Sequence, residues 1–366
     1  MVKEEFLNKL VNTERNKNVF EEMKESQLPL IMFGGGSMSY SIRKLLRKEH
    51  IEVAACWIDN CSENESIDGI PVLNLEMIKK RYNKINVVFG HSKYELEDII
   101  MEENPFINKC YCLVNVCYGQ WKAITYDFVR DHVNEYIDTY ELLEDEMSKE
   151  CMIAYLNCKL EEDYRFLLPV CQEISTYFDN PFFTISENED YVDIGAYNGD
   201  TIREFLQSVQ SYSNIYGIEP ENKSFDELVA YVKNNNLECI ELHNCGCWDS
   251  DTVLKLKKDE ESSTIAQNGD EEINEYIYID TYMLDSLLKN RTVTLVKINF
   301  LNGVVETLKG AKEILNKQKP RLIITVGFDE WGIINIPQII KEINPEYKMG
   351  LRYAAAMPAR LILFAY

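Results

Sequence analysis

Glycine and acidic residues gather in one short segment, residues 191–201, which reads YVDIGAYNGDT. An apolar run stops at Gly195, passes Gly199 and continues into TIREFLQSV, whose spacing predicts a helix. A strand that ends at small residues and re-enters as a helix leaves backbone amides and space for a ligand in the turn. Because Asp193 and Asp200 add negative charge there, the segment is a candidate site for a ligand that carries positive charge.

The glycine spacing distinguishes this turn from a dinucleotide-binding loop. Such loops read G-x-G-x-x-G and seat a pyrophosphate on a helix N-terminus, whereas this one reads G-x-x-x-G between two carboxylates. Glu219 closes the next predicted strand, NIYGIEP, where an acid can accept hydrogen bonds from both ribose hydroxyls. A cationic sulfonium with an amino-acid tail suits this set, so S-adenosylmethionine is the predicted cofactor.

The predicted cofactor-binding residues lie at strand ends and in the turns that follow them. They are Asp193, Gly195, Ala196, Tyr197, Gly199, Asp200, Thr201, Glu219 and Asp249. Structural alternatives stay open for several of them. Asp200 and Thr201 also form an ordinary helix start, and Asp249 either approaches the adenine amino group or is a turn aspartate. An ordinary strand-turn-helix with a chance acid would explain the glycine turn without any ligand.

A second glycine turn lies near the N-terminus, at residues 34–39. Gly34, Gly36 and Ser39 approximate G-x-G-x-x-G with serine in the last place, and Asp59 ends the following strand. This turn could hold a nucleotide or a nucleotide sugar. It could equally serve only to let a helix pack closely on a sheet. The two readings remain open.

The elements around these turns predict an α/β protein. An N-terminal Rossmann-like domain is expected over residues 1–120, with strands at LPLIMF, VAACWIDN, INVVFG and CYCLVNV. Residues 121–180 lack strand signals and predict a helical connector. Residues 181–366 predict a class I methyltransferase sheet, with strands at YVDIGAY, NIYGIEP, CIELHNCGCW, TLVKINF and RLIITVG, an antiparallel pair at VLKLKKD and EYIYIDTY, and a closing hairpin from YKMGLRY and RLILFAY.

The amino-acid composition limits which binding partners and which cellular location are expected for this chain. Acidic residues outnumber basic ones by 61 to 38 in a chain of 366 residues, so nucleic acid and anionic membranes are not expected partners. The eleven cysteines are irregularly spaced and the four histidines form no metal-spaced pair, which indicates reduced thiols and no metal site. No apolar run approaches the length of a membrane span, so a cytoplasmic location is expected. Homo-oligomer formation stays open.

From about residue 141 onward the chain resembles the FkbM-type family of S-adenosylmethionine-dependent methyltransferases, including members with an extra N-terminal Rossmann-like domain. The motifs that carry the resemblance are DEMSKE, YFDNPFF, VDIGAYNGDTIREF, YGIEPEN, GCWD, IDTYMLDSL and VETLKGA. The resemblance implies methyl transfer, usually to oxygen, on a glycan-linked or small-molecule acceptor.

The chain departs from the family where acceptor chemistry is expected. The family pattern K-[IM]-D-x-E-G-A-E has Asn299, Leu301 and Val304 in place of its three carboxylates, and Phe328 stands in place of a histidine. At the last hairpin the family's R-H and E-T become Arg352-Tyr353 and Arg360-Leu361. Asn299 is the best remaining candidate for the catalytic side of the pocket, although an amide cannot act as a base at neutral pH. Two hypotheses follow: a methyltransferase with a changed acceptor, or a catalytically silent cofactor-binding protein.

Overall fold

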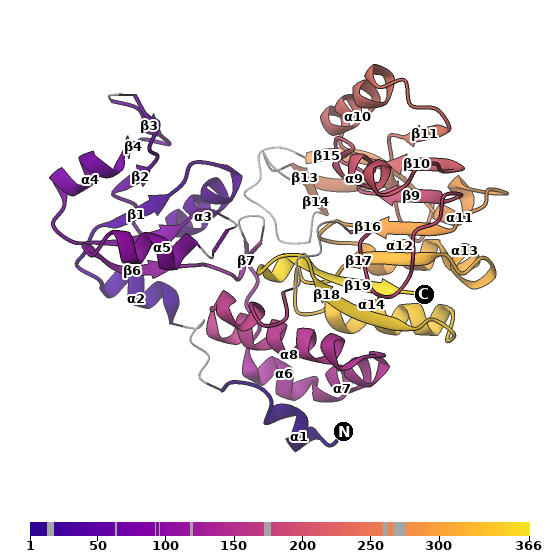
Figure 1. Cartoon of the computed structure of the whole chain (residues 1–366), viewed down its shortest axis with the longest axis horizontal. Helices are drawn as coiled ribbons and strands as arrows, with labels where there is room; N and C mark the ends of the chain where they lie inside the picture. Colours follow the sequence, from indigo (N-terminus) through magenta and orange to yellow (C-terminus); the bar gives the residue numbers. More distant parts are fainter. Residues whose placement is uncertain are drawn as a thin grey trace. The chain divides into compact units, whose positions relative to one another are not determined.

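The computed structural model divides the chain into two compact units (Figure 1). It describes residues 1–12, 18–62, 64–91, 93–94, 96–117, 120–171, 177–258, 263–265 and 276–366. The first unit comprises Met1–Asn134, Met152–Cys171 and Ala356–Ala359, and the second comprises Glu135–Cys151, Gln172–Ala355 and Arg360–Tyr366. The division by sequence into residues 1–120, 121–180 and 181–366 stays a prediction.

The first unit is built on a six-stranded sheet in the order β3-β4-β2-β1-β5-β6. Its strands are β1 (Leu30–Phe33), β2 (Ala55–Trp57), β3 (Ser66–Ile67), β4 (Ile70–Leu73), β5 (Ile85–Phe89) and β6 (Ile107–Tyr111). The first six helices are α1 (Lys3–Leu7), α2 (Val19–Glu25), α3 (Ser37–Lys48), α4 (Leu75–Arg81), α5 (Leu96–Glu103) and α6 (Tyr126–Asp131). Only β3 pairs antiparallel, so the Rossmann-like character predicted for this region is confirmed.

Two regions of the first unit differ from the sequence prediction. The segment CYCLVNV is a strand only at its start, because β6 ends at Tyr111. The backbone amide of Asn115 donates to the Glu162 carboxylate at 3.0 Å and is therefore not available to the sheet. The residues beyond it form a short hairpin of β7 (Val116–Cys117) and β8 (Gln120–Trp121). The β3–β4 hairpin was missed, although its Asp68-Gly69 turn is a hairpin signal.

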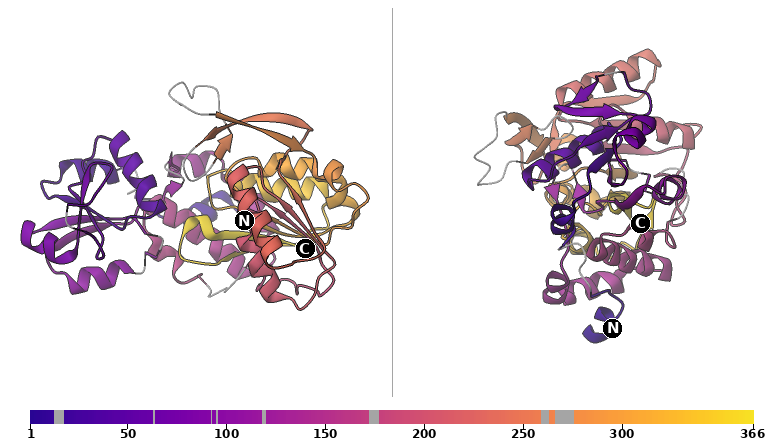
Figure 2. Two further views of the ribbon diagram at one scale, coloured as in Figure 1. Left: turned by 90° about the horizontal axis from the view of Figure 1, so that it is seen from above. Right: turned by 90° about the vertical axis from the view of Figure 1, so that its left-hand side faces the viewer.

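The second unit is built on a seven-stranded sheet in the order β11-β10-β9-β16-β17-β19-β18, with helices on both faces (Figure 2). Its strands are β9 (Asp190–Ile194), β10 (Asn214–Ile218), β11 (Ile240–His243), β16 (Leu295–Ile298), β17 (Arg321–Thr325), β18 (Met349–Tyr353) and β19 (Leu361–Ala365). The strands are parallel except at β19, which pairs antiparallel with both neighbours. The predicted fold class and closing hairpin are confirmed.

Helices link these strands. They are α9 (Asp200–Ser208), α10 (Asn222–Asn234), α11 (Leu284–Leu287), α12 (Val304–Gly310), α13 (Lys312–Lys317) and α14 (Gly332–Ile343). Buried apolar side chains on α9, including Ile202 and Phe205, pack on the sheet, and the Phe205 ring stacks on Tyr191 of β9. This packing fixes the start of α9 against the end of β9. Helix α7 (Val133–Leu142), helix α8 (Glu146–Glu161) and the short η2 (Tyr164–Leu167) occupy much of the predicted helical connector.

A separate four-stranded sheet in the order β12-β15-β13-β14 lies beyond β11 in the chain. Its strands are β12 (Gly246–Cys247), β13 (Thr252–Lys258), β14 (Ser263–Ile265) and β15 (Tyr276–Tyr282). Strands β13 and β15 pair antiparallel, with Leu254 opposite Ile279, as their alternating residues predicted. Glu275 of the predicted segment lies outside the described residues. Among the described helices, none is long and apolar enough to cross a membrane.

Candidate functional site

The turn between β9 and α9 requires glycine at two places. Gly195 and Gly199 have φ angles of +76° and +83°, in the left-handed region that favours glycine. A Cβ on Gly195 would lie 3.0 Å from the Asn299 carbonyl oxygen, so the ends of β9 and β16 approach too closely for a side chain. Tyr197 between them also has a positive φ of 49°. The turn is therefore a tight, backbone-lined cradle at the carboxyl ends of the parallel strands.

A buried ion pair between β9 and β16 stabilises this cradle. The Lys297 ammonium on β16 lies 2.9 Å from Asp193 on β9, and the two side chains are 1% and 0% exposed. The Thr201 hydroxyl donates to the other Asp193 oxygen at 2.6 Å, and Lys297 also reaches the Gly195 carbonyl at 3.2 Å. Burial opposes the charge of Lys297, but the nearby Asp193 carboxylate outweighs it and raises the pKa of Lys297. The bonds of Asp193 to Thr201 and to Lys297 thus fix both ends of the turn.

Lys297 is a residue that sequence reasoning missed. Its signal is a lone lysine inside an otherwise apolar strand, TLVKINF, opposite Asp193 in the parallel register of β9 and β16. A buried lysine in such a strand needs a charged partner.

Glu219 follows β10 and faces the same turn. One carboxylate oxygen accepts from the Tyr197 amide and the other from the Glu221 amide, both at 2.9 Å. The residue is 7% exposed, and burial raises the pKa of Glu219 although the two amide bonds act in the opposite direction. Each oxygen accepts one bond from the backbone and retains a second lone pair. The carboxylate is thus oriented and can still accept from a vicinal diol.

The remaining predicted cofactor residues lie in different settings. Ala196 is buried, and its amide bonds the Ile218 carbonyl at 3.1 Å. Asp200 is exposed at the first turn of α9. Asp249 is exposed in the turn between β12 and β13, where it accepts from the Ser250 hydroxyl at 2.9 Å. The residue that directly follows β11 and bonds the Glu219 carbonyl, at 3.0 Å, is instead Asn244.

Asn299 directly follows β16, and its carbonyl oxygen lies beside Gly195. Its side-chain amide donates to the Tyr177 hydroxyl at 3.4 Å, and that hydroxyl also accepts from Arg360 at 3.0 Å. The predicted catalytic candidate therefore lies beside the cradle, but in a cluster with two residues to which the sequence assigned no role. No short motif could have revealed the cluster, because its members are far apart in the chain.

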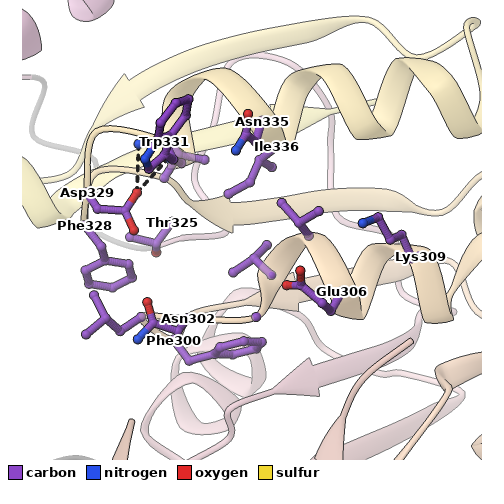
Figure 3. Close-up of a pocket in the computed structure, with 16 residues that line it drawn as sticks. Phe300, Asn302, Glu306, Lys309, Thr325, Phe328, Asp329, Trp331, Asn335 and Ile336 are labelled. Carbon is purple, nitrogen blue, oxygen red and sulfur yellow. Dashed lines mark hydrogen bonds between the residues drawn. The ribbon is translucent and has the colours of Figure 1, made fainter. Parts of the chain in front are cut away.

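A cavity of about 520 Å³ opens between α12 and α14, next to the loops that follow β16 and β17 (Figure 3). Its lining residues are Phe300, Leu301, Asn302, Gly303, Val304, Val305, Glu306, Lys309, Thr325, Val326, Phe328, Asp329, Trp331, Gly332, Asn335 and Ile336. The lining starts one residue beyond Asn299, so the cavity and the cradle share the loop after β16. This places a second compartment beside the predicted cofactor turn.

Six of the sixteen lining residues have polar or charged side chains: Asn302, Glu306, Lys309, Thr325, Asp329 and Asn335. The Thr325 hydroxyl is buried and has no hydrogen-bond partner in the described part of the chain. Asp329 accepts from the amides of Trp331 and Gly332 at 3.0 and 2.8 Å, the dashed lines of Figure 3, and so caps the start of α14. Glu306 lies on the α12 side. An orphaned buried hydroxyl among aromatic walls is suited to a ligand with a polar, uncharged group.

The N-terminal glycine turn is filled by the protein itself. The Ser39 hydroxyl donates to the Gly34 carbonyl at 2.9 Å and accepts from Arg43 at 2.7 Å. A Cβ on Gly35 would lie 2.5 Å from the Ile58 side chain. These contacts are those of a helix packed closely on a sheet, and a nucleotide or nucleotide sugar at this turn stays a prediction.

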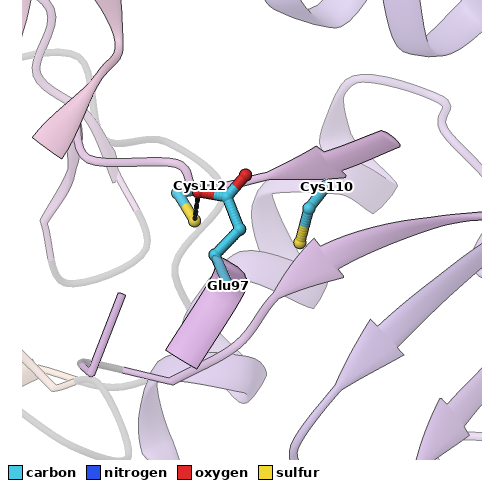
Figure 4. A group of neighbouring side chains, drawn as sticks. All are labelled: Glu97, Cys110 and Cys112. Carbon is cyan, nitrogen blue, oxygen red and sulfur yellow. Dashed lines mark hydrogen bonds between the residues drawn. The ribbon is translucent and has the colours of Figure 1, made fainter. Parts of the chain in front are cut away.

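One group among the described residues has ligand atoms close enough to hold a metal ion: Glu97, Cys110 and Cys112 (Figure 4). The Cys112 thiol donates to the Glu97 carboxylate at 3.6 Å, and Arg165 pairs with the same oxygen at 2.9 Å. Because the guanidinium already compensates the carboxylate, the group is explained by internal hydrogen bonding. All ten cysteines whose side chains are described are free thiols.

The sheet order, the glycine turn and the acid at the end of the next strand define a Rossmann-like methyltransferase fold. Comparison with known families agrees, since the model of the methyltransferase FkbM domain matches residues 193–347. This part of the chain is therefore similar to the methyltransferase FkbM domain. The resemblance drawn from the sequence is thereby confirmed.

One solved structure shows a similar fold over 95% of the chain. A methyltransferase FkbM from Methylobacillus flagellatus is 18% identical, with a TM-score of 0.72 over 95% of this chain and 93% of that one. An rRNA methylase from Streptococcus thermophilus is 14% identical, with a TM-score of 0.32 over 50% and 87%. A Streptococcus mutans protein assigned as a methyltransferase, solved with S-adenosylhomocysteine, is 13% identical, with a TM-score of 0.30 over 49% and 89%. No curated protein matches the chain.

Proposed function

We propose that the second unit binds S-adenosylmethionine at the turn between β9 and α9. We further propose that any methyl transfer it catalyses goes to a hydroxyl of a glycan-linked or small-molecule acceptor in the cavity between α12 and α14. The observation that carries the proposal is the Glu219 carboxylate, which two backbone amides orient beside a glycine cradle. S-adenosylmethionine, when bound, supplies a methyl group on a positively charged sulfur.

The chain's own residues have four tasks in this proposal. Glu219 accepts hydrogen bonds from the ribose hydroxyls, and the Asp193–Lys297 pair keeps the cradle in shape. The cavity orients the acceptor hydroxyl, with Thr325 as a hydrogen-bonding group. An ionisable group must take the proton of that hydroxyl. Asp329 is held by two amides, and Glu306 accepts no hydrogen bond among the described contacts, so Glu306 is the better candidate.

A second candidate function, cofactor binding without chemistry, is favoured by one observation. Asn299, at the place of a family carboxylate, makes a hydrogen bond to Tyr177 and carries no charge. The same cofactor pocket would then sense S-adenosylmethionine or support a partner.

Binding of S-adenosylhomocysteine, measured by titration calorimetry, tests the shared part of both functions. We expect binding by the native chain and a loss of about 1–3 kcal/mol on Glu219→Ala, the cost of leaving paired polar groups unsatisfied. The matched control is Glu227→Ala, which removes an exposed carboxylate from the neighbouring helix α10. Absence of both heat and thermal shift at millimolar ligand would refute cofactor binding.

A further inference from the structure

Three side chains meet beside the cofactor turn without forming part of it. The Tyr177 hydroxyl accepts from a guanidinium nitrogen of Arg360 at 3.0 Å and from the side-chain amide of Asn299 at 3.4 Å. They come from the segment before β9, the short turn η3 (Pro358–Arg360) that leads into β19, and the end of β16. The fold therefore brings together three segments that are distant in the chain.

Backbone contacts place this cluster against the cradle. The Asn299 amide donates to the Ile194 carbonyl at 3.3 Å, and the Asn299 carbonyl occupies the space where a Cβ on Gly195 would lie. The Tyr177 backbone amide donates to the Glu204 carboxylate at 2.9 Å. Glu204 lies on α9, the helix that follows the cofactor turn. Tyr177 is therefore anchored between α9 and the end of β16, at the carboxyl edge of the sheet.

The cluster is rich in hydrogen-bond donors. Arg360 is exposed, and among the described contacts its guanidinium forms no ion pair and donates only to Tyr177. Because the Tyr177 oxygen already accepts two N–H bonds, its own O–H points in a third direction. The other cation nearby, Lys297, is already paired with Asp193. A guanidinium, a phenol O–H and an amide N–H side by side are suited to a carboxylate.

We propose that Tyr177, Asn299 and Arg360 form a carboxylate-binding site that holds the α-carboxylate of the amino-acid tail of S-adenosylmethionine. The proposal rests on the proposed function, since it assumes that the adenosine part lies on Glu219. It assigns a positioning role to Arg360 and Tyr177, and it replaces the catalytic role considered for Asn299 by a binding role. The tail would then be fixed at both ends, by the cradle on one side and by this cluster on the other.

The test compares two ligands that differ only in the tail. S-adenosylhomocysteine carries the carboxylate, whereas 5′-methylthioadenosine has the same adenosine and thioether without it. Titration calorimetry is performed on the full chain with native protein, Arg360→Gln and Tyr177→Phe. The control is Arg291→Gln, which removes an exposed guanidinium that pairs with Glu241 in the same unit. Thermal melting checks that every variant is folded.

We expect Arg360→Gln to weaken S-adenosylhomocysteine binding by about 10-fold to 100-fold, the range for a charge-assisted hydrogen bond, and to leave methylthioadenosine binding unchanged. Tyr177→Phe should act in the same direction and less strongly, and Arg291→Gln should change neither. An unchanged ratio of the two affinities in the Arg360 and Tyr177 variants would overturn the proposal. If acetate then protects the native chain but not Arg360→Gln against melting, the site belongs to an acceptor carboxylate instead of the cofactor tail. Failure of the native chain to bind either nucleoside would overturn the proposed function itself.

Discussion

At the scale of single residues, the cofactor turn depends on two opposite charges, Asp193 and Lys297, that neutralise each other. Asp193 and Lys297 are both fully buried, and their bonds to each other and to Thr201 connect β9, β16 and the start of α9. Such a pair specifies which strands lie side by side more than it adds net stability, because the cost of removing two charges from water offsets most of their attraction.

Removing one member of the pair should therefore destabilise the second unit more than removing both members does. We expect Asp193→Asn or Lys297→Met alone to destabilise the second unit by about 3–5 kcal/mol, since each leaves a buried group without its partner. The double variant should recover part of that loss. Hydrogen exchange of the β9 and β16 amides measures the effect locally. A double variant as unstable as the sum of the singles would contradict the argument.

The pKa of Glu219 makes cofactor binding sensitive to acid. Burial raises this pKa above the ordinary value of 4.5, so the carboxylate takes up a proton at a higher pH than an exposed glutamate does. A protonated carboxyl has less capacity to accept from ribose hydroxyls. We expect the affinity for S-adenosylhomocysteine to be constant near neutral pH and to fall as the pH drops through the raised pKa. Glu219→Gln should bind more weakly and without this decline, and an identical decline in the glutamine variant would assign the effect to another group.

At the scale of elements, the turn between β9 and α9 illustrates how far sequence reasoning reaches. The run YVDIGAYNGDT predicts the strand, the turn and the helix because their signals are local. The same holds for the alternating β13 and β15. Tyr177 and Arg360 could not be predicted as neighbours of the turn, because they reach it only through the tertiary fold, whereas the lone Lys297 in an apolar strand was a signal that was missed. The strand predicted at CYCLVNV was correct only at its start, in β6, and the limit has a related reason: the backbone amide of Asn115 is taken by Glu162, a partner distant in sequence.

The close approach of β9 and β16 gives a prediction for glycine. Gly195→Ala should deform the turn, since the residue has a φ of +76° and its Cβ would lie 3.0 Å from the Asn299 carbonyl oxygen. We expect S-adenosylhomocysteine binding to fall at least 10-fold, of the order of one lost hydrogen bond. Gly36→Ala is the matched control, since Gly36 has a φ of −80° and no atom within 4 Å of the added Cβ. Equal affinities of the native chain and the Gly195 variant would show that the turn does not shape the cofactor site.

At the scale of the whole molecule, the likeness to the Methylobacillus flagellatus structure covers 95% of the chain, so it includes both units. From the formal charge of −23 we still expect that nucleic acid and anionic membranes are not partners of this chain. The cavity between α12 and α14 is lined by charged side chains of both signs, Glu306, Lys309 and Asp329, in addition to the buried Thr325 hydroxyl. What separates an enzyme from a cofactor sensor is then the presence of a base in that cavity.

The last prediction concerns that choice. We expect the native chain to methylate simple sugar hydroxyls very slowly or not at all, because Asn299 and Phe328 occupy places where the family has ionisable groups. General-base assistance is worth about 10²–10⁴-fold, so its loss can bring turnover below detection while the cofactor remains bound. The measurement is transfer of a labelled methyl group to a panel of hydroxyl acceptors by the native chain and by the triple variant Asn299→Asp, Leu301→Glu and Phe328→His.

Glu306→Gln, made in both backgrounds, identifies the base. Glu306 lines the cavity and accepts no hydrogen bond among the described contacts, so it is the acid best placed to replace the missing carboxylates. Robust turnover by the native chain would contradict the prediction, and its loss on Glu306→Gln would assign the base to this residue. Turnover gained only by the triple variant would show that the chain retains a donor site whose acceptor chemistry has been removed. Silence in both backgrounds, with S-adenosylhomocysteine still bound, would favour the sensor, because binding would then be the property that the fold preserves.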